Sequence, residues 1–251
     1  MTEGGTAPIL EVNGAKKSFG QQEVLKGVSF KLYPHETLGL LGLSGSGKSV
    51  LLRSLIALER LDEGQIIFQG EEIQDLSEEA FLGLRPKISY AFQNGALFDS
   101  LTVYENLAFP LHEHTSLSEP EIERKILATL DLVGLKDKTE MLPADLSGGM
   151  QKRVGLARSI ILQPEIILYD EPTSGLDPTN TQKTMDIINK IKVQGAASII
   201  VTHDMFVALG LCQRVMILAQ GQIAYTGSVD EFKNENAALI QSFMQNKISE
   251  D

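Results

Sequence analysis

Eight residues, Gly42 to Ser49 with the sequence GLSGSGKS, carry the pattern best suited to holding anionic oxygen atoms. They fit the spacing G-x-x-x-x-G-K-[ST], follow the apolar run ETLGLLG, and precede the helical run VLLRSLIALE. In such a loop the glycines let backbone N–H groups surround phosphates, the lysine reaches the outer phosphates, and the hydroxyl holds Mg²⁺. The alternative is a chance glycine turn. The sequence predicts a nucleotide phosphate site made of Gly42, Leu43, Ser44, Gly45, Ser46, Gly47, Lys48, Ser49 and Val50.

Two adjacent carboxylates, Asp170 and Glu171, end the apolar run IILYDEP. A carboxylate at the tip of a buried strand beside the phosphate loop can bind Mg²⁺, and a second can orient and deprotonate an attacking water. We therefore assign Asp170 to the metal and Glu171 to the general base. Two exposed carboxylates at a strand end are the alternative, but here PTSGLDP follows them.

Two other apolar runs, ISYAFQ and SIIVTH, end in the polar residues Gln93 and His203. Ligands bind at the carboxyl ends of strands in open parallel sheets. Gln93 is a candidate for the Mg²⁺ and water side of the site, and His203 for donation to the γ-phosphate. Each of them, taken singly, is equally the residue with which a strand ends.

A second possible phosphate-facing element is the start of the run LSGGMQKRVGLARSI. Ser147 is a good helix N-cap, and Gly148 and Gly149 leave the first backbone amides uncovered. A plain helix cap is the alternative interpretation. The pattern raises the question of why one chain has two such helix starts about a hundred residues apart.

The elements that must position these residues indicate an α/β fold. GVSFKLY alternates apolar and polar residues, as a half-buried strand does, while ETLGLLG is continuously apolar, as in a buried parallel strand. Ser118 and Glu121 form a capping box before an apolar face at Ile122, Ile126, Leu130 and Val133. Further strands are expected in ILEV, GQIIFQG, EIILYDEP, ASIIVTHD and, as one run, RVMILAQGQIAYTG; a further helix is expected in TNTQKTMDIINKIKV.

Composition limits the possible partners and compartments. The chain has 251 residues, and its 33 acidic against 22 basic residues give a charge of −11, which argues against nucleic-acid binding. Cys212 is the only cysteine, so no internal disulfide forms and a reducing compartment is expected. The start MTEGGTAPIL is not a secretory signal, and no apolar run approaches the ~20 residues that span a bilayer. We expect a soluble protein that reaches a membrane only through a partner.

The motifs together resemble the ATPase subunit of ATP-binding-cassette (ABC) transporters, over almost the whole chain. GLSGSGKS, Gln93, LSGGM, YDEPTSGLDP and His203 occur in the family's order. One departure is Met150, which stands where the family's LSGGQ has glutamine, with Gln151 after it. The resemblance implies a P-loop NTPase core with a mainly parallel sheet, an N-terminal antiparallel β subdomain and an inserted helical subdomain. It implies one domain over residues 1–251, with the core at 1–94 and 164–251 and the helical insert at about 95–163.

The resemblance also implies why there are two helix starts. In the family two cassettes face head to tail, and each ATP, with Mg²⁺, lies between the phosphate loop of one copy and the Ser-Gly-Gly helix start of the other. Ser147, Gly148, Gly149 and the stretch Ser174 to Asp177 would then act across the homodimer interface. Phe19 matches the aromatic residue that stacks on adenine; a core or edge-strand phenylalanine is the alternative. The insert, entered at Gln93, would pass the motion of the dimer to another protein.

The stretch Phe92 to Thr115 looks like that of the Mla-type ATPases, which energise phospholipid traffic with a permease and an MCE-domain lipid-binding protein. This resemblance implies a peripheral ATPase on the cytoplasmic face of the inner membrane, with a possible small cytoplasmic accessory subunit. The alternatives are the ATPase of a small-molecule importer and a soluble ABC ATPase without a transport role. The chain's end, with Leu239, Ile240, Phe243 and Met244 inward, is expected to form a helix that either closes the domain or grips the second copy.

Overall fold

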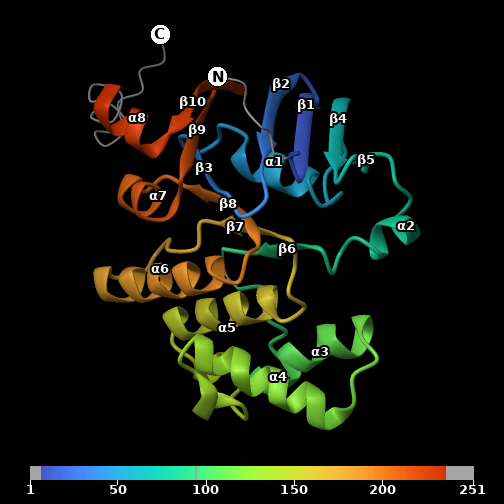
Figure 1. Ribbon diagram of the computed structural model, residues 1–251, viewed down its shortest axis with the longest axis vertical. Helices are drawn as coiled ribbons and strands as arrows, with labels where there is room; N and C mark the ends of the chain where they lie inside the picture. The colour runs from blue at the N-terminus through green and yellow to red at the C-terminus, as the bar shows by residue number, and fades with distance from the viewer. Residues whose placement is uncertain (1–6, 94, 236–251) are drawn as a thin grey trace. The chain divides into compact units, whose positions relative to one another are not determined.

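The structure, a computed structural model, describes residues 7–93 and 95–235 (Figure 1). The chain forms two compact units, one of residues 1–82 with 197–251 and the other of residues 83–196. We refer to them as the first and the second unit. The finer boundaries expected for the helical subdomain, about 95–163, stay a prediction.

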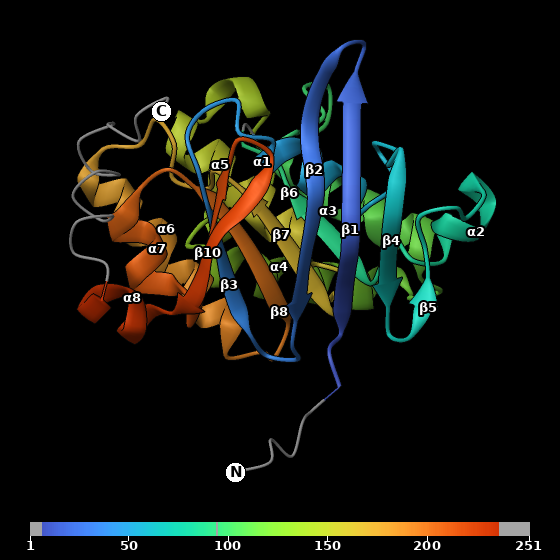
Figure 2. The ribbon, with the colours of Figure 1, turned by 90° about the horizontal axis from the view of Figure 1, so that it is seen from above.

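The strands β2, β1, β4 and β5 of the first unit lie side by side in an antiparallel sheet (Figure 2). Val28, Phe30 and Leu32 are buried and Ser29 and Lys31 between them are exposed, so the predicted half-buried strand is confirmed. Strand β1 is hydrogen-bonded on both sides, to β2 and to β4. The sheet order is β2-β1-β4-β5, with β1 at Leu10–Phe19, β2 at Gln22–Leu32, β4 at Glu63–Phe68 and β5 at Glu71–Glu72.

The first unit also contains a set of parallel strands around β3 (Thr37–Leu41). All five residues of β3 are buried, as its continuous apolar run predicts. Strand β3 pairs in parallel with β8 (Ala197–Thr202) on one side and β9 (Arg214–Ala219) on the other. The unit's helices are α1 at Lys48–Ser54, α2 at Glu78–Leu82, α7 at Met205–Leu211 and α8 at Val229–Glu235.

One strand prediction is wrong. RVMILAQGQIAYTG forms two antiparallel strands, β9 and β10 (Gln222–Ser228), rather than one run. Gln220 and Gly221 both have positive φ, 49° and 81°, and Ala219 pairs with Gln222. Two left-handed residues in a two-residue loop form the tight turn that matches the twist of a hairpin.

The second unit combines a parallel strand pair with helices. Strands β6 (Ile88–Ala91) and β7 (Ile166–Asp170) run parallel, and Ala91 lies opposite Tyr169. Helix α4 begins after the predicted capping box of Ser118 and Glu121, and its predicted apolar face is buried. Helix α3 contacts α4 and α5, and α5 contacts β6 and α6. The helices are α3 at Val103–His114, α4 at Glu119–Leu132, α5 at Gly148–Ile160 and α6 at Pro178–Lys192, with 3₁₀ turns at Lys136–Lys138 and Pro143–Asp145.

Two sequence expectations concern the membrane and the end of the chain. None of the helices in residues 7–93 and 95–235 combines the length and the apolar character needed to cross a bilayer. The apolar residues Leu239, Ile240, Phe243 and Met244 lie outside the described residues, so the role expected for the end of the chain stays a prediction.

Candidate functional site

The predicted phosphate loop lies between β3 and α1 in the first unit, and its backbone requires glycine at specific positions. A Cβ atom on Gly42 would lie 2.5 Å from the carbonyl oxygen of Leu218 and 2.5 Å from Oγ of Ser46, which is too close for any side chain. Gly47 caps α1 with φ of 104°, a conformation that L side chains rarely adopt. The chain can therefore form a tight turn here, as a loop that surrounds a ligand with its backbone N–H groups requires.

The interior of the loop is polar and suits an anionic ligand. Lys48 is buried, and its Nζ donates to the carbonyl oxygens of Gly42 at 2.7 Å and Leu43 at 2.9 Å. The Ser46 hydroxyl is buried and has no hydrogen-bond partner within the part of the chain that the structure describes. A buried polar atom without a partner is costly, and a phosphate oxygen accepting from it would remove the cost. The residues present therefore fit a bound phosphate chain.

The two predicted carboxylates lie at the end of β7 in the second unit, and both are half-buried. Asp170 Oδ2 accepts from the Tyr90 hydroxyl at 2.6 Å, so β6 fixes the orientation of this carboxylate. Glu171 has φ of 50°, the left-handed region that non-glycine residues enter at a cost of about 1–3 kcal/mol and that is frequent at functional sites. The chain thus turns sharply at Glu171, directly after the strand.

The role expected of Asp170 in holding Mg²⁺ stays a prediction. No group of three or more His, Cys, Asp or Glu side chains within residues 7–93 and 95–235 is arranged to hold a metal ion. Mg²⁺ is usually bound through one or two carboxylates, waters and the phosphates of a substrate. A single carboxylate such as Asp170, at the end of β7, is a donor of this kind.

Ser174 connects several of the predicted residues of the second unit. Its Oγ accepts from Nε2 of Gln93 at 3.2 Å, and its backbone N–H donates to the carbonyl oxygen of Glu171 at 3.1 Å. Its own carbonyl oxygen accepts from Nζ of Lys152. The structure therefore brings Gln93 against the turn that follows Glu171. The sequence does not single out Lys152, since a lysine in a helix carries no signal that distinguishes it from a solvated one.

Helix α5 begins at Gly148 with Ser147 as its N-cap, as predicted, and both of these residues are exposed. The Ser147 hydroxyl accepts from the Met150 N–H at 3.3 Å, so it caps the helix. A Cβ placed on Gly148 would meet no atom within 4 Å. Gln151 donates from Nε2 to the carbonyl oxygens of Pro143 at 2.8 Å and Leu146 at 3.4 Å, both of which precede the helix. The Ser147 cap is therefore present with Met150 in place of glutamine, and Gly148 is exposed, whereas Gly149 is half-buried and its Cβ would lie 3.4 Å from Cγ of Asn180.

Asp177 has a clear role within a single chain. It caps α6 by accepting from the N–H groups of Thr179 at 2.9 Å and Asn180 at 3.0 Å. The pKa of its carboxyl lies below the ordinary value, first because of the backbone N–H of Asn180 and then because of the Asn180 side-chain amide. The action expected of Asp177 across a dimer interface stays a prediction.

His203 and Phe19 both lie at strand ends in the first unit. His203 directly follows β8 and is exposed. Phe19 is the last residue of β1, and 47% of its surface is exposed, with Nζ of Lys17 at 5.2 Å from the ring centroid. Phe19 is therefore neither a core residue nor part of an edge strand. Its ring is accessible, and its contact with adenine stays a prediction.

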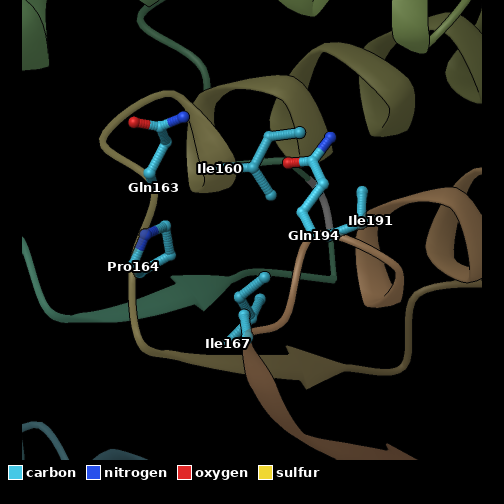
Figure 3. A pocket seen from close by; sticks show the side chains of 7 residues that line it. Ile160, Gln163, Pro164, Ile167, Ile191 and Gln194 are labelled. Atoms are coloured by element: carbon cyan, nitrogen blue, oxygen red, sulfur yellow. The ribbon is translucent and has the colours of Figure 1, made fainter. Parts of the chain in front are cut away.

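A small cavity in the second unit lies away from these motifs, between the C-terminal ends of α5 and α6 (Figure 3). Ile160, Ile167 and Ile191 give it apolar walls, with Gln163 and Gln194 nearby. Its volume of about 70 Å³ is several-fold below the roughly 300–1,000 Å³ of ordinary ligand pockets. It is too small for a nucleotide.

Comparison with known proteins gives the family. The model of the ABC transporter family matches residues 25–174. The chain is 38% identical to the protein TRIGALACTOSYLDIACYLGLYCEROL 3, chloroplastic, of Arabidopsis thaliana, over 94% of this chain and 73% of the relative. It is 39% identical to the probable ribonucleotide transport ATP-binding protein mkl of Mycobacterium bovis, over 95% and 67%. It is 37% identical to the methionine import ATP-binding protein MetN of Brucella abortus, over 96% and 65%.

A solved structure agrees with these relatives. The ATP-binding cassette MJ0796, in a dimeric post-hydrolysis state bound to ADP and Pi, superposes with a TM-score of 0.81 at 30% identity, covering 88% of this chain and 98% of that chain. The shared fold is an α/β P-loop NTPase core with a mainly parallel sheet, an antiparallel N-terminal sheet and additional helices. These matches, with the phosphate loop and the carboxylates at the end of β7, show that the chain belongs to the ABC transporter family and is one of its ATPases.

Proposed function

We propose that this ATPase energises phospholipid transport between the inner and outer membranes, as part of an MCE-type system. It acts as a homodimer on the cytoplasmic face of the inner membrane. Its partners are an integral-membrane permease and an MCE-domain lipid-binding protein, with a small cytoplasmic accessory subunit as a possible third; nucleic acid is not among them.

Each motif has a proposed role in hydrolysis. Lys48 and the amides of the phosphate loop bind the phosphates, and Phe19 stacks on adenine. Ser49, Asp170 and Gln93 hold Mg²⁺, which would neutralise the phosphate charge. Glu171 deprotonates the attacking water, and His203 donates to the γ-phosphate. The buried Ser46 hydroxyl and the orientation of Asp170 by Tyr90 support these roles.

The second helix start supports the proposed head-to-tail homodimer. Ser147 to Gly149 form a capped, open helix start, and a Cβ on Gly148 meets nothing within 4 Å in the single chain. Amides at such a start attract phosphate. The dimeric MJ0796 cassette with ADP and Pi supports a shared arrangement of this kind. We assign the Ser-Gly-Gly amides to the γ-phosphate bound by the other copy, with Asp177 close to the same interface.

The segment that follows Gln93 is the observation that carries the transport role. Phe98 and Phe109 lie edge to face with centroids 5.2 Å apart, yet 40% and 44% of their surfaces are exposed. Asn106, which is fully buried, fixes the loop before α3 by accepting from the Phe98 N–H at 2.8 Å and donating to the Leu101 carbonyl oxygen at 2.9 Å. A fixed loop and the helix that follows it, which together expose the rings of Phe98 and Phe109, suit the docking of a helix of the permease.

The class of molecule that is transported is a separate part of the proposal. The stretch Phe92 to Thr115 resembles the Mla-type ATPases, and one relative carries the name of a galactolipid. The printed names of two other relatives refer to ribonucleotide transport and methionine import. Import of a small polar molecule is therefore the second candidate, because the methionine import relative is nearly as similar as the first.

Two measurements on the native complex test the proposal. The chain is purified from its own membranes with its partners, and the co-eluting proteins are identified. The complex is then placed in vesicles, and ATP-driven transfer of a fluorescent phospholipid is compared with uptake of methionine and of a ribonucleotide. Lipid transfer that stops in the Glu171→Gln variant supports the proposal. Uptake of a polar solute without lipid transfer would contradict it and favour the importer.

A further inference from the structure

Three basic residues of α5, Lys152, Arg153 and Arg158, each form a hydrogen bond to the backbone of another segment. Lys152 is half-buried, and the burial of all three side chains lowers the pKa of each below its ordinary value. Each of them donates to a backbone carbonyl oxygen of a different segment. These acceptors are Ser174 for Lys152, Val133 at 3.0 Å for Arg153, and Ala96 at 2.6 Å for Arg158. Helix α5 is therefore held to the end of α4, to the loop before α3 and to the turn after β7.

The bond from Lys152 fixes the turn that contains the proposed base. Within this turn the Ser174 N–H donates to the Glu171 carbonyl oxygen at 3.1 Å, and the Leu176 N–H donates to the Thr173 carbonyl oxygen at 3.2 Å. Both of these bonds are local and keep the turn compact without fixing its position. Lys152 supplies a bond from another element, α5, whose N-cap Ser147 lies five residues before Lys152.

The same turn also carries the acceptor for Gln93. Nε2 of Gln93 donates to the Ser174 Oγ at 3.2 Å, so the backbone position of Ser174 sets where this amide lies. Attraction to the charge of Glu171 raises the pKa of Lys152, although burial lowers it more. The ammonium group of Lys152 thus acts on both proposed catalytic residues of the second unit, through the Ser174 carbonyl and through its charge.

We propose that Lys152 is a positioning residue for ATP hydrolysis, which holds the Ser174 turn so that Glu171 and Gln93 are oriented together. This inference rests on the proposed roles of Glu171 and Gln93. Because Lys152 lies on the helix that begins with the Ser-Gly-Gly start, it also links that start to the base of the same chain. Loss of Lys152 should slow the chemical step and leave ATP binding at the phosphate loop unchanged.

The test compares Lys152→Met, which keeps the length of the side chain without its charge, with Lys152→Arg, which keeps a cationic donor. Lys183→Met, at an exposed lysine of α6, is the matched control. For the full chain we measure kcat and KM for ATP, the affinity for a fluorescent ATP analogue, and the thermal unfolding transition. Lys152→Met is expected to lower kcat roughly 10-fold or more, as loss of a charge-assisted hydrogen bond would, and to change affinity less than about 2-fold. Lys152→Arg should recover most of kcat, and Lys183→Met should match the wild type.

The proposal is contradicted if Lys152→Met retains kcat within about 2-fold of the wild type, or if affinity falls as much as kcat. If that variant does not fold, Lys152→Gln serves in its place. Ser174→Ala, which removes the acceptor of Gln93, gives an independent check. In the double variant, the loss of kcat should be smaller than the product of the two single losses, since both substitutions act through one turn. A loss equal to that product would count against the proposal. Glu171→Gln is assayed in parallel, because full turnover there would refute the base itself rather than its positioning.

Discussion

Nζ of Lys48 donates a 2.7 Å hydrogen bond to the carbonyl oxygen of Gly42, the first residue of its own loop. This bond holds the ammonium group inside the loop whose backbone we propose binds the phosphates. A loop that already orients its lysine loses little conformational entropy when the ligand binds. This contact makes the phosphate loop a preorganised site.

Lys48→Ala is expected to weaken ATP binding itself. A lysine–phosphate bond is charge-assisted, and bonds of this type contribute about 1.5–3 kcal/mol, which is roughly 10- to 100-fold in affinity. Equilibrium titration with a fluorescent ATP analogue measures the change. Lys26→Ala, at an exposed lysine of β2, is the control and should bind as the wild type does. Equal affinities for the two variants would remove Lys48 from the site.

Glu171→Gln is expected to retain ATP binding and to lose turnover by roughly 10²–10⁴-fold, the usual contribution of a positioned base. The substitution preserves the shape of the side chain, so the left-handed turn at position 171 is kept. Because ATP persists, the closed dimer should accumulate, which size-exclusion chromatography with ATP measures. Glu123→Gln, on the exposed side of α4, should retain both turnover and reversible dimerisation. Substantial steady-state turnover in the Glu171 variant would exclude this residue as the base.

Ser147→Arg is expected to prevent dimer closure while leaving ATP binding to one copy nearly intact. The arginine fills the open helix start that we assign to the phosphate of the other copy. It also removes the helix cap, which by itself costs about 1 kcal/mol. Ser118→Arg makes the same exchange at the N-cap of α4, where Ser118 Oγ donates to Glu121 at 2.6 Å, and is the control. The prediction fails if both variants form ATP-dependent dimers equally well.

Gly155→Ala is expected to destabilise the second unit. An alanine Cβ would lie 2.5 Å from the Gly95 Cα and 3.0 Å from the Gly95 carbonyl oxygen, and both of these are backbone atoms. Overpacking of this kind costs about 1–3 kcal/mol, so Tm should fall by several degrees. In Gly148→Ala, at another position of α5, the Cβ meets no atom within 4 Å, so Tm should be unchanged or higher. Equal Tm values for the two variants would contradict the close approach of α5 to Gly95.

The features that the sequence predicts well are local ones. The glycine loop is predicted because a buried strand, its glycines and a helix occur in succession, and Gly47 does take a left-handed conformation. Helix α4 is predicted because Ser118 and Glu121 cap each other and Ile122 begins a face of helical period. The hairpin of β9 and β10 was missed because Gln220 is not a typical turn residue, so the apolar alternation looks continuous across it.

The features that could not be predicted depend on contacts between distant residues. Gln93 and Ser174 are 81 positions apart, and Lys152 and Ser174 are 22 apart. Neither pair has a spacing that identifies it, since both contacts arise when α5, β6 and β7 pack together. Asn106 is another case, because a polar residue on α3 becomes fully buried only when the preceding loop folds onto it.

The proposed head-to-tail homodimer requires that one copy of the chain lacks a complete hydrolytic site. The most direct test is the specific ATPase activity of the full chain as a function of its concentration, with the oligomeric state followed in the same samples. With a shared site, we expect the activity per molecule to rise steeply with concentration and to level off when the ATP-bound dimer is fully populated. A constant activity per molecule, down to concentrations at which every chain is a monomer, would contradict it.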